Sequence, residues 1–229
     1  MSESISEAFY GIVQKEDKDG IDIVIKAGTV NESVHIPVLL SQSGIQEVVY
    51  NDFYIGENAD VTIVAGCGIH NCGVDTSKHD GVHTFYIGKN ADVVIVAGCG
   101  IHNSTCSESR HDGIHRFFLE ENAKVKYIEK HYGEGEGTGK KVLNPVTEVY
   151  LKENSALEME SVQIKGVDST IRTTKGIVEE NANFVVTEKI MTHGNQFAKT
   201  IFEVELKGKN SSTHVTSRSV ATDDSVQEF

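Results

Sequence analysis

The protein has 229 residues, a formal net charge of −13 at pH 7 and 38% hydrophobic residues. A chain of this length can bury a substantial core, while its acidic surface repels nucleic-acid phosphates and anionic lipid headgroups. No 18-residue apolar run is present, and the first residues do not form a basic and then apolar leader. We therefore expect a cytoplasmic protein that binds neither nucleic acid nor a membrane. The four cysteines predict thiols or metal ligands rather than a disulfide framework.

Residues 1–50 contain short β-like runs, at 21–28, at 33–40 and from residue 46 onward. Runs of Val and Ile that are bounded by Gly and Asn favour strands over helices. We expect an N-terminal β segment over residues 1–50 that leads into a repeat region at residues 51–229.

The repeat region begins with two nearly identical copies of one segment. YIGENADVTIVAGCGIHN (Tyr54–Asn71) returns 32 residues later as YIGKNADVVIVAGCGIHN (Tyr86–Asn103). A weaker third start follows at the same offset, and later segments keep the order of a charged residue, an Asn, a small residue and an alternating run. A fixed period of this length is typical of stacked coils, in which each coil covers the open edge of its neighbour. The sequence thus predicts an all-β, single-stranded parallel β-helix, or β-solenoid.

Cysteine and histidine recur within each copy. The spacings C-x2-H-x-C and C-x2-H-x3-C give six candidate cofactor ligands: Cys67, His70 and Cys72, then Cys99, His102 and Cys106. Two further histidines follow in each copy. Together with the first cysteine of each copy, they make six candidate metal ligands: Cys67, Cys99, His79, His83, His111 and His115. Thiolate and imidazole are ligands for zinc, iron and iron–sulfur clusters.

The period decides whether these residues meet. If one repeat is one coil, Cys67 stacks on Cys99 and His70 on His102 at about 4.8 Å. Such pairs could chelate a soft metal or form a disulfide, whose Cα separations overlap this spacing. If 32 residues make two coils, the pairs separate. The cysteines can also be small buried packing residues, and the HDGxH segments can simply cap a turn.

Other motifs give weaker signals. GEGEGTGKK resembles a phosphate-binding loop, but Glu134 stands where that loop needs Gly, and Lys141 where it needs Ser or Thr. We therefore expect a solvated loop over residues 131–141. The sequence contains no GxSxG motif of the kind that indicates a hydrolase.

Several segments carry a family resemblance: VAGCGIHN, HDGIHRFFL, KYIEKHYGEGEGTGKKVLNPVTEVYL, MESVQIKGVDST, EKIMTHGNQFA and NSSTHVTSRSVA. From about Tyr50 to Phe229 the chain resembles the core domain of the SufB/SufD family of iron–sulfur cluster assembly proteins. The resemblance implies a right-handed parallel β-helix that acts as a scaffold or scaffold partner and not as a classical enzyme. It implies a transient iron–sulfur cluster or iron as cofactor, with zinc as an alternative. The implied partners are a SufC-like ATPase, a SufB/SufD-like subunit in a homo- or heterodimer, and a cysteine desulfurase or sulfur carrier.

Two departures from the family pattern matter. Family chains continue past the SRSVA segment into more β-helix and a helical region that docks the ATPase. The cluster-acceptor residues of SufB-type scaffolds lie in that later portion, so no family catalytic residue carries over to this chain. We expect the chain alone to be impaired in docking the ATPase. The tandem GCGIHN unit, expected once, adds a coil and doubles the Cys/His set.

Two other function classes stay open at this stage. The chain could be a structural β-helix module for interaction and dimerisation, without a metal or cluster of its own. It could also be a carbohydrate-active β-helix enzyme, which needs acidic residues close together in a cleft. Glu153, Glu158 and Glu160 alternate with other residues as on a solvated face, so we rank this class last.

Overall fold

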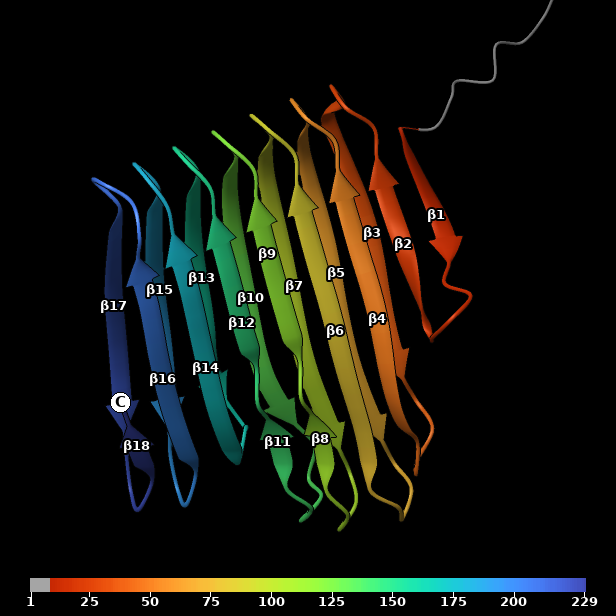
Figure 1. The fold of residues 1–229 in the computed structure, drawn as a ribbon. Helices are drawn as coiled ribbons and strands as arrows, with labels where there is room; N and C mark the ends of the chain where they lie inside the picture. Colours follow the sequence, from red (N-terminus) through yellow and green to blue (C-terminus); the bar gives the residue numbers. More distant parts are fainter. Residues whose placement is uncertain (1–8) are drawn as a thin grey trace, which may run out of the picture.

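The computed structural model describes residues 9–229, and all regular elements in that range are β-strands (Figure 1). They form two sheets. The first sheet contains β1 (Tyr10–Gln14), β2 (Gly20–Ile25), β4 (Gln46–Ile55), β6 (Ser77–Ile87), β8 (Ser109–His111), β9 (Ile114–Leu119), β11 (Lys141–Leu143), β12 (Val146–Leu151), β14 (Ser169–Val178), β16 (Phe197–Leu206) and β18 (Val226–Glu228). The second sheet contains β3 (Val30–Leu40), β5 (Asp60–Asn71), β7 (Asp92–Asn103), β10 (Lys124–Glu134), β13 (Ala156–Lys165), β15 (Asn183–Thr192) and β17 (Ser212–Ala221). No helix in the described range is long and apolar enough to cross a membrane.

The chain alternates between the two sheets, so that one coil contributes to each (Figure 1). Strands β5 and β7 pair in parallel from Asp60 opposite Asp92 to Asn71 opposite Asn103. The register offset is therefore the 32-residue period of the sequence. The predicted β-solenoid is confirmed, and the alternative of two coils per repeat is wrong. Only β1 departs from the parallel pattern among the strands described, because it pairs antiparallel with β2.

One corner of each coil is turned by an asparagine in the left-handed region. These residues have φ between 54° and 60°: Asn31, Asn58, Asn90, Asn122, Asn154, Asn181 and Asn210. Asn tolerates this conformation better than other residues with a Cβ. The side chains also bond along the stack, since Asn90 Nδ2 donates to Asn58 Oδ1 at 3.2 Å and Asn122 Nδ2 donates to Asn90 Oδ1 at 3.0 Å. The Asn-Ala pattern in the sequence is this corner.

The core between the sheets begins as a stack of identical apolar side chains. Phe53, Phe85 and Phe117 are buried, with ring centroids 4.5 and 5.0 Å apart. Burying each Phe contributes roughly 1.5–3 kcal/mol. A second, smaller apolar cluster contains Ile69 and Ile101 from the far ends of β5 and β7. Cys99 belongs to this second cluster and Cys67 packs against it, and on the next strand of the same sheet Glu129 and His131 are buried.

The expected solvated loop over residues 131–141 is wrong at its ends, because both lie in strands β10 and β11. The intervening glycines pack on the loop of the preceding coil. Gly137 N donates to Asn103 O at 3.1 Å, and Gly139 N donates to Thr105 O at 2.9 Å. A Cβ on Gly139 would lie 1.9 Å from Ser107 O. Glycine is required here by the close approach of two backbones rather than by a phosphate.

The segment boundary expected at residue 50 stays a prediction. Strand β4 crosses it, and strands β2 and β3 pair with β4 and β5 in parallel. The N-terminal strands thus continue the same two sheets.

Candidate metal centre inside the solenoid

Two cysteines and a histidine meet in the interior. Cys67 on β5 lies opposite Cys99 on β7 in the parallel register, and their sulfur atoms are 2.9 Å apart. His111 on β8 approaches from the other sheet, with Nε2 3.2 Å from Cys67 Sγ. Cys99 and His111 are each 3% exposed, whereas Cys67 is half-buried. The three ligand atoms all lie within 4.8 Å of one another.

The orientation of His111 leaves a lone pair for the sulfurs. Its Nδ1 lies 2.8 Å from the carbonyl oxygen of His79, to which only an N–H can donate. In the neutral ring, Nε2 therefore carries the lone pair that faces Cys67. A backbone contact that fixes the far ring nitrogen is the usual way in which proteins orient a metal-binding histidine.

Both cysteines are free thiols in this arrangement. The hydrogen bond with Cys67 and burial raise the pKa of Cys99 to about 12. Cys99 is therefore a neutral thiol near pH 7, and a metal must displace protons in order to bind.

The four downstream histidines also lie inside, on the first sheet. His79 stacks on His111 with ring centroids 5.2 Å apart, and His83 lies 5.3 Å from His115. Burial, followed by the neighbouring His111, lowers the pKa of His79, and burial holds the pKa of His83 well below its ordinary value. Both rings are thus neutral near pH 7 and keep a lone pair. His83 and His115 line a small cavity together with the two cysteines.

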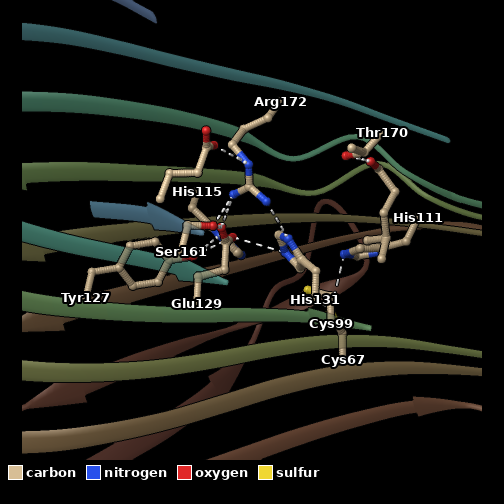
Figure 2. A network of polar contacts seen from close by, with 12 residues as sticks. Cys67, Cys99, His111, His115, Tyr127, Glu129, His131, Ser161, Thr170 and Arg172 are labelled. Atoms are coloured by element: carbon tan, nitrogen blue, oxygen red, sulfur yellow. Dashed lines mark hydrogen bonds and ion pairs between the residues drawn. The ribbon is translucent and has the colours of Figure 1, made fainter. Parts of the chain in front are cut away.

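A buried network of charged side chains lies next to the two cysteines, in the interior of the solenoid (Figure 2). Arg172 on β14 donates from Nη1 to Glu129 Oε2 at 2.8 Å, and its Nη2 lies 3.0 Å from His131 Nδ1. Its Nε lies 3.1 Å from a carboxylate oxygen of Glu188. Tyr127 donates its hydroxyl proton to Glu129 Oε1 at 2.8 Å. Figure 2 shows His131 between this ion pair and the two cysteines.

Electrostatics keep this network charged. Burial alone would raise the pKa of Glu129, but His131, His115 and Arg172 together hold it well below its ordinary value. Burial likewise opposes a charge on His131, and Glu129 raises its pKa above the ordinary value. Glu129 is therefore a carboxylate with no exposed surface, and its charge is compensated by Arg172 on the facing strand.

Sequence reasoning missed Glu129, His131 and Arg172 as site residues. A signal for two of them was present, because the 32-residue offset that links Cys67 to Cys99 continues to His131. The structure pairs His131 with Cys99 and Glu129 with Ala97. Arg172 lies on the other sheet, so no period along one sheet points to it.

The six candidates from the C-x2-H spacings separate. Side chains alternate between the faces of a strand, so Cys67 and Cys99 point inward while His70, Cys72 and His102 gather on the outer surface. Cys106 is exposed, and the structure does not bring it into a metal-ligand group within the described range. The interpretation of HDGxH as a turn cap is wrong, since Asp80 accepts from Lys78 on the same strand at 2.7 Å.

Comparison with known protein families decides the family. A family model described as the SufBD core domain of the SUF system for iron–sulfur cluster assembly matches residues 114–229, which is just over half of the chain. This chain belongs to the SufBD core-domain family. A search of curated proteins finds no match.

The family match covers the buried charge network but not the two inward cysteines. His115, Glu129, His131 and Arg172 lie within the SufBD match, whereas the two repeat copies, with both inward cysteines, precede it. The interior nevertheless fits iron and sulfide chemistry, because thiolate and imidazole suit iron and iron–sulfur clusters. His79 Nε2 is buried and has no hydrogen-bond partner within residues 9–229, and its ring stacks on that of His111, which contacts Cys67.

Proposed function

We propose that this SufBD-family chain is a scaffold or scaffold-partner subunit for iron–sulfur cluster assembly and not a classical enzyme. The cluster, or the iron and sulfide from which it is built, is its cargo. In this proposal a SufC-like ATPase and a cysteine desulfurase or sulfur carrier act with it, and a SufB- or SufD-like subunit pairs with it. Family membership supports the assembly role.

The observation that carries a local site on this chain is the buried meeting of Cys67, Cys99 and His111. Two sulfurs 2.9 Å apart and an imidazole nitrogen 3.2 Å from one of them form a soft donor set. The neighbouring His79 and His83 stay neutral because burial lowers their pKa values, and so they add no positive charge beside the donor set. Arg172 and Glu129 form a buried ion pair at 2.8 Å, so their charges compensate each other.

Anaerobic reconstitution with Fe²⁺ and sulfide tests this proposal. The wild-type chain is expected to acquire iron, acid-labile sulfide and a visible absorbance band, and the Cys67→Ser/Cys99→Ser variant is expected to lose the sulfide and the band. Cys106→Ser is the matched control, because Cys106 is exposed and outside the donor set. Equal sulfide content in the wild type and in the double variant would remove the site.

A second candidate function is a structural module for interaction and dimerisation, with cysteines that only pack. The pKa of about 12 at Cys99 favours it, because buried unreactive thiols have raised pKa values. Metal and sulfide analysis of protein purified without air discriminates the two. A wild-type chain that dimerises with itself or with a related subunit, yet stays colourless after reconstitution, would establish the structural role instead.

A further inference from the structure

We propose that His70, Cys72 and His102 form a second metal site, on the outer surface of the solenoid, for a divalent cation that prefers nitrogen and sulfur, with Zn²⁺ as its occupant. The site is separate from the interior donor set and does not depend on the proposed function.

The three ligand atoms are already gathered. Cys72 Sγ lies 3.0 Å from His70 Nε2, and the rings of His70 and His102 stack with centroids 4.6 Å apart at an interplanar angle of 7°. All three ligand atoms lie within 4.8 Å of one another. Zinc is bound by cysteine at about 2.3 Å and by histidine at about 2.0–2.1 Å, so small side-chain rotations would let all three reach one ion.

The repeat explains why the donors converge. His70 lies near the end of β5 and Cys72 directly follows the strand, two residues on and therefore on the same side, while His102 is the register partner of His70 on β7. Both imidazoles turn Nε2 the same way: His70 Nε2 contacts Cys72 Sγ, and His102 Nε2 contacts Ser104 Oγ at 2.9 Å. Positions 72 and 104 are one period apart, so the two nitrogens face the same row of side chains.

The remaining coordination position is open to solvent. Glu134 follows His102 in the row, but its carboxylate is engaged by Lys165 Nζ at 3.2 Å. Cys72 and His70 are exposed and His102 is half-buried. Two histidines, one cysteine and a water form a four-coordinate set of the kind that zinc accepts.

The second copy provides a natural comparison. Ser104 stands where the first copy has Cys72, so the tandem unit contains one complete three-ligand set rather than two. An ion held by His70 and Cys72 from one coil and His102 from the next would link the two coils. It would stabilise the folded chain in proportion to RT ln(1 + [Zn²⁺]/Kd).

The test uses the full chain with Cys67→Ser/Cys99→Ser, so that the interior thiols are absent. Four proteins are compared: the background itself and the same background with Cys72→Ser, Cys106→Ser or His102→Asn. Zn²⁺ affinity is measured by competition with a chromophoric chelator, and Co²⁺ is added separately to detect the thiolate-to-metal charge-transfer band. Circular dichroism verifies the fold, and Cys72→Ser merely installs the residue that the second copy already has.

The background and Cys106→Ser are expected to bind one Zn²⁺ per chain and to show the Co²⁺–thiolate band. In Cys72→Ser the band is lost and Zn²⁺ affinity falls on the order of 100-fold. His102→Asn is expected to weaken Zn²⁺ binding in the background while Cys72 is still present. Equal Zn²⁺ affinity with and without Cys72, or a thiolate band that Cys106→Ser abolishes, would overturn the proposal. Neither outcome bears on iron or sulfide at the interior cysteines.

Discussion

At the scale of single residues, the interior holds a network of buried ion pairs, in which Arg172 contacts Glu129 and Glu188. Glu129 has no exposed surface, and Arg172 is 2% exposed. Taking each charge out of water costs several kcal/mol, which is offset only while its partner is present. The pair therefore makes both residues sensitive to substitution, whatever the chain binds.

Replacing Glu129 by Gln keeps the shape of the side chain but leaves Arg172 and His131 without their shared carboxylate. We expect the free energy of unfolding in urea to fall by about 3–5 kcal/mol. Glu158→Gln on neighbouring strand β13 is the control, because Glu158 is exposed, and we expect a change within about 0.5 kcal/mol. Similar losses in the two variants would show that the network contributes no special stability.

Because Glu129 is held ionised, we expect the stability of the protein to depend on pH. The pKa of Glu129 is lower in the folded state than its ordinary value of 4.5, so the folded state binds this proton less readily than the unfolded state. Its contribution to stability is present above pH 4.5 and is lost as the pH falls below that value.

Urea unfolding between pH 3 and pH 6 tests this dependence. The wild type is expected to lose stability more steeply than Glu129→Gln below pH 4.5, by up to about 1.4 kcal/mol per pH unit. Parallel slopes in the two proteins would mean that Glu129 is not held ionised.

At the scale of elements, the Asn corner sets where each coil turns. Asn90 has φ of 57°, and its side chain links the corners at Asn58 and Asn122. An alanine at this position keeps a Cβ in the left-handed region, which costs about 1–2 kcal/mol, whereas glycine adopts it freely.

We therefore expect Asn90→Ala to destabilise the protein by about 1–2 kcal/mol more than Asn90→Gly, measured by thermal or urea unfolding. Asn90→Gly should lose only the two side-chain hydrogen bonds, about 1 kcal/mol each. If the glycine variant is no more stable than the alanine variant, backbone conformation is not what selects asparagine at the corner.

The pairing of the strands explains which contacts could be predicted from the sequence and which could not. The stacking of Cys67 on Cys99 could be predicted, because identical copies in parallel register place identical residues side by side. The position of His131 beside Cys99 could also be predicted, by extending the same 32-residue offset once more. The contact of His111 with Cys67 joins residues 44 apart, and that of Arg172 with Glu129 joins residues 43 apart. Both depend on how the two sheets face each other, which alternation along a single strand does not specify.

At the scale of the whole molecule, each coil pairs in parallel with its neighbours, and the two repeat copies are offset by one complete coil of 32 residues, so the solenoid should tolerate removal of that coil. Deleting residues 60–91 joins Ala59 to Asp92, which restores the Ala-Asp junction already present at residue 91. Strand β7 then takes the place of β5 beside β3, with nearly the same sequence.

We expect this 32-residue deletion to keep a β-type circular dichroism spectrum and cooperative unfolding at a lower midpoint. Deleting residues 60–75 instead removes half a coil and brings β6 to the position of a second-sheet strand, so that variant should not fold. Two deletions with equal effects would contradict the period as the structural unit.

We propose that consecutive coils bring Cys67, Cys99 and His111 together as ligands for iron. Iron K-edge X-ray absorption tests it most directly, on protein loaded anaerobically with one equivalent of Fe²⁺ and with Cys72 replaced by Ser so that the outer thiol is absent. We predict sulfur neighbours from two thiolates together with nitrogen, and loss of the sulfur signal when Cys67 and Cys99 are also replaced by Ser. An iron spectrum with oxygen and nitrogen neighbours alone, while both inner cysteines are present, would show that these cysteines do not bind the iron.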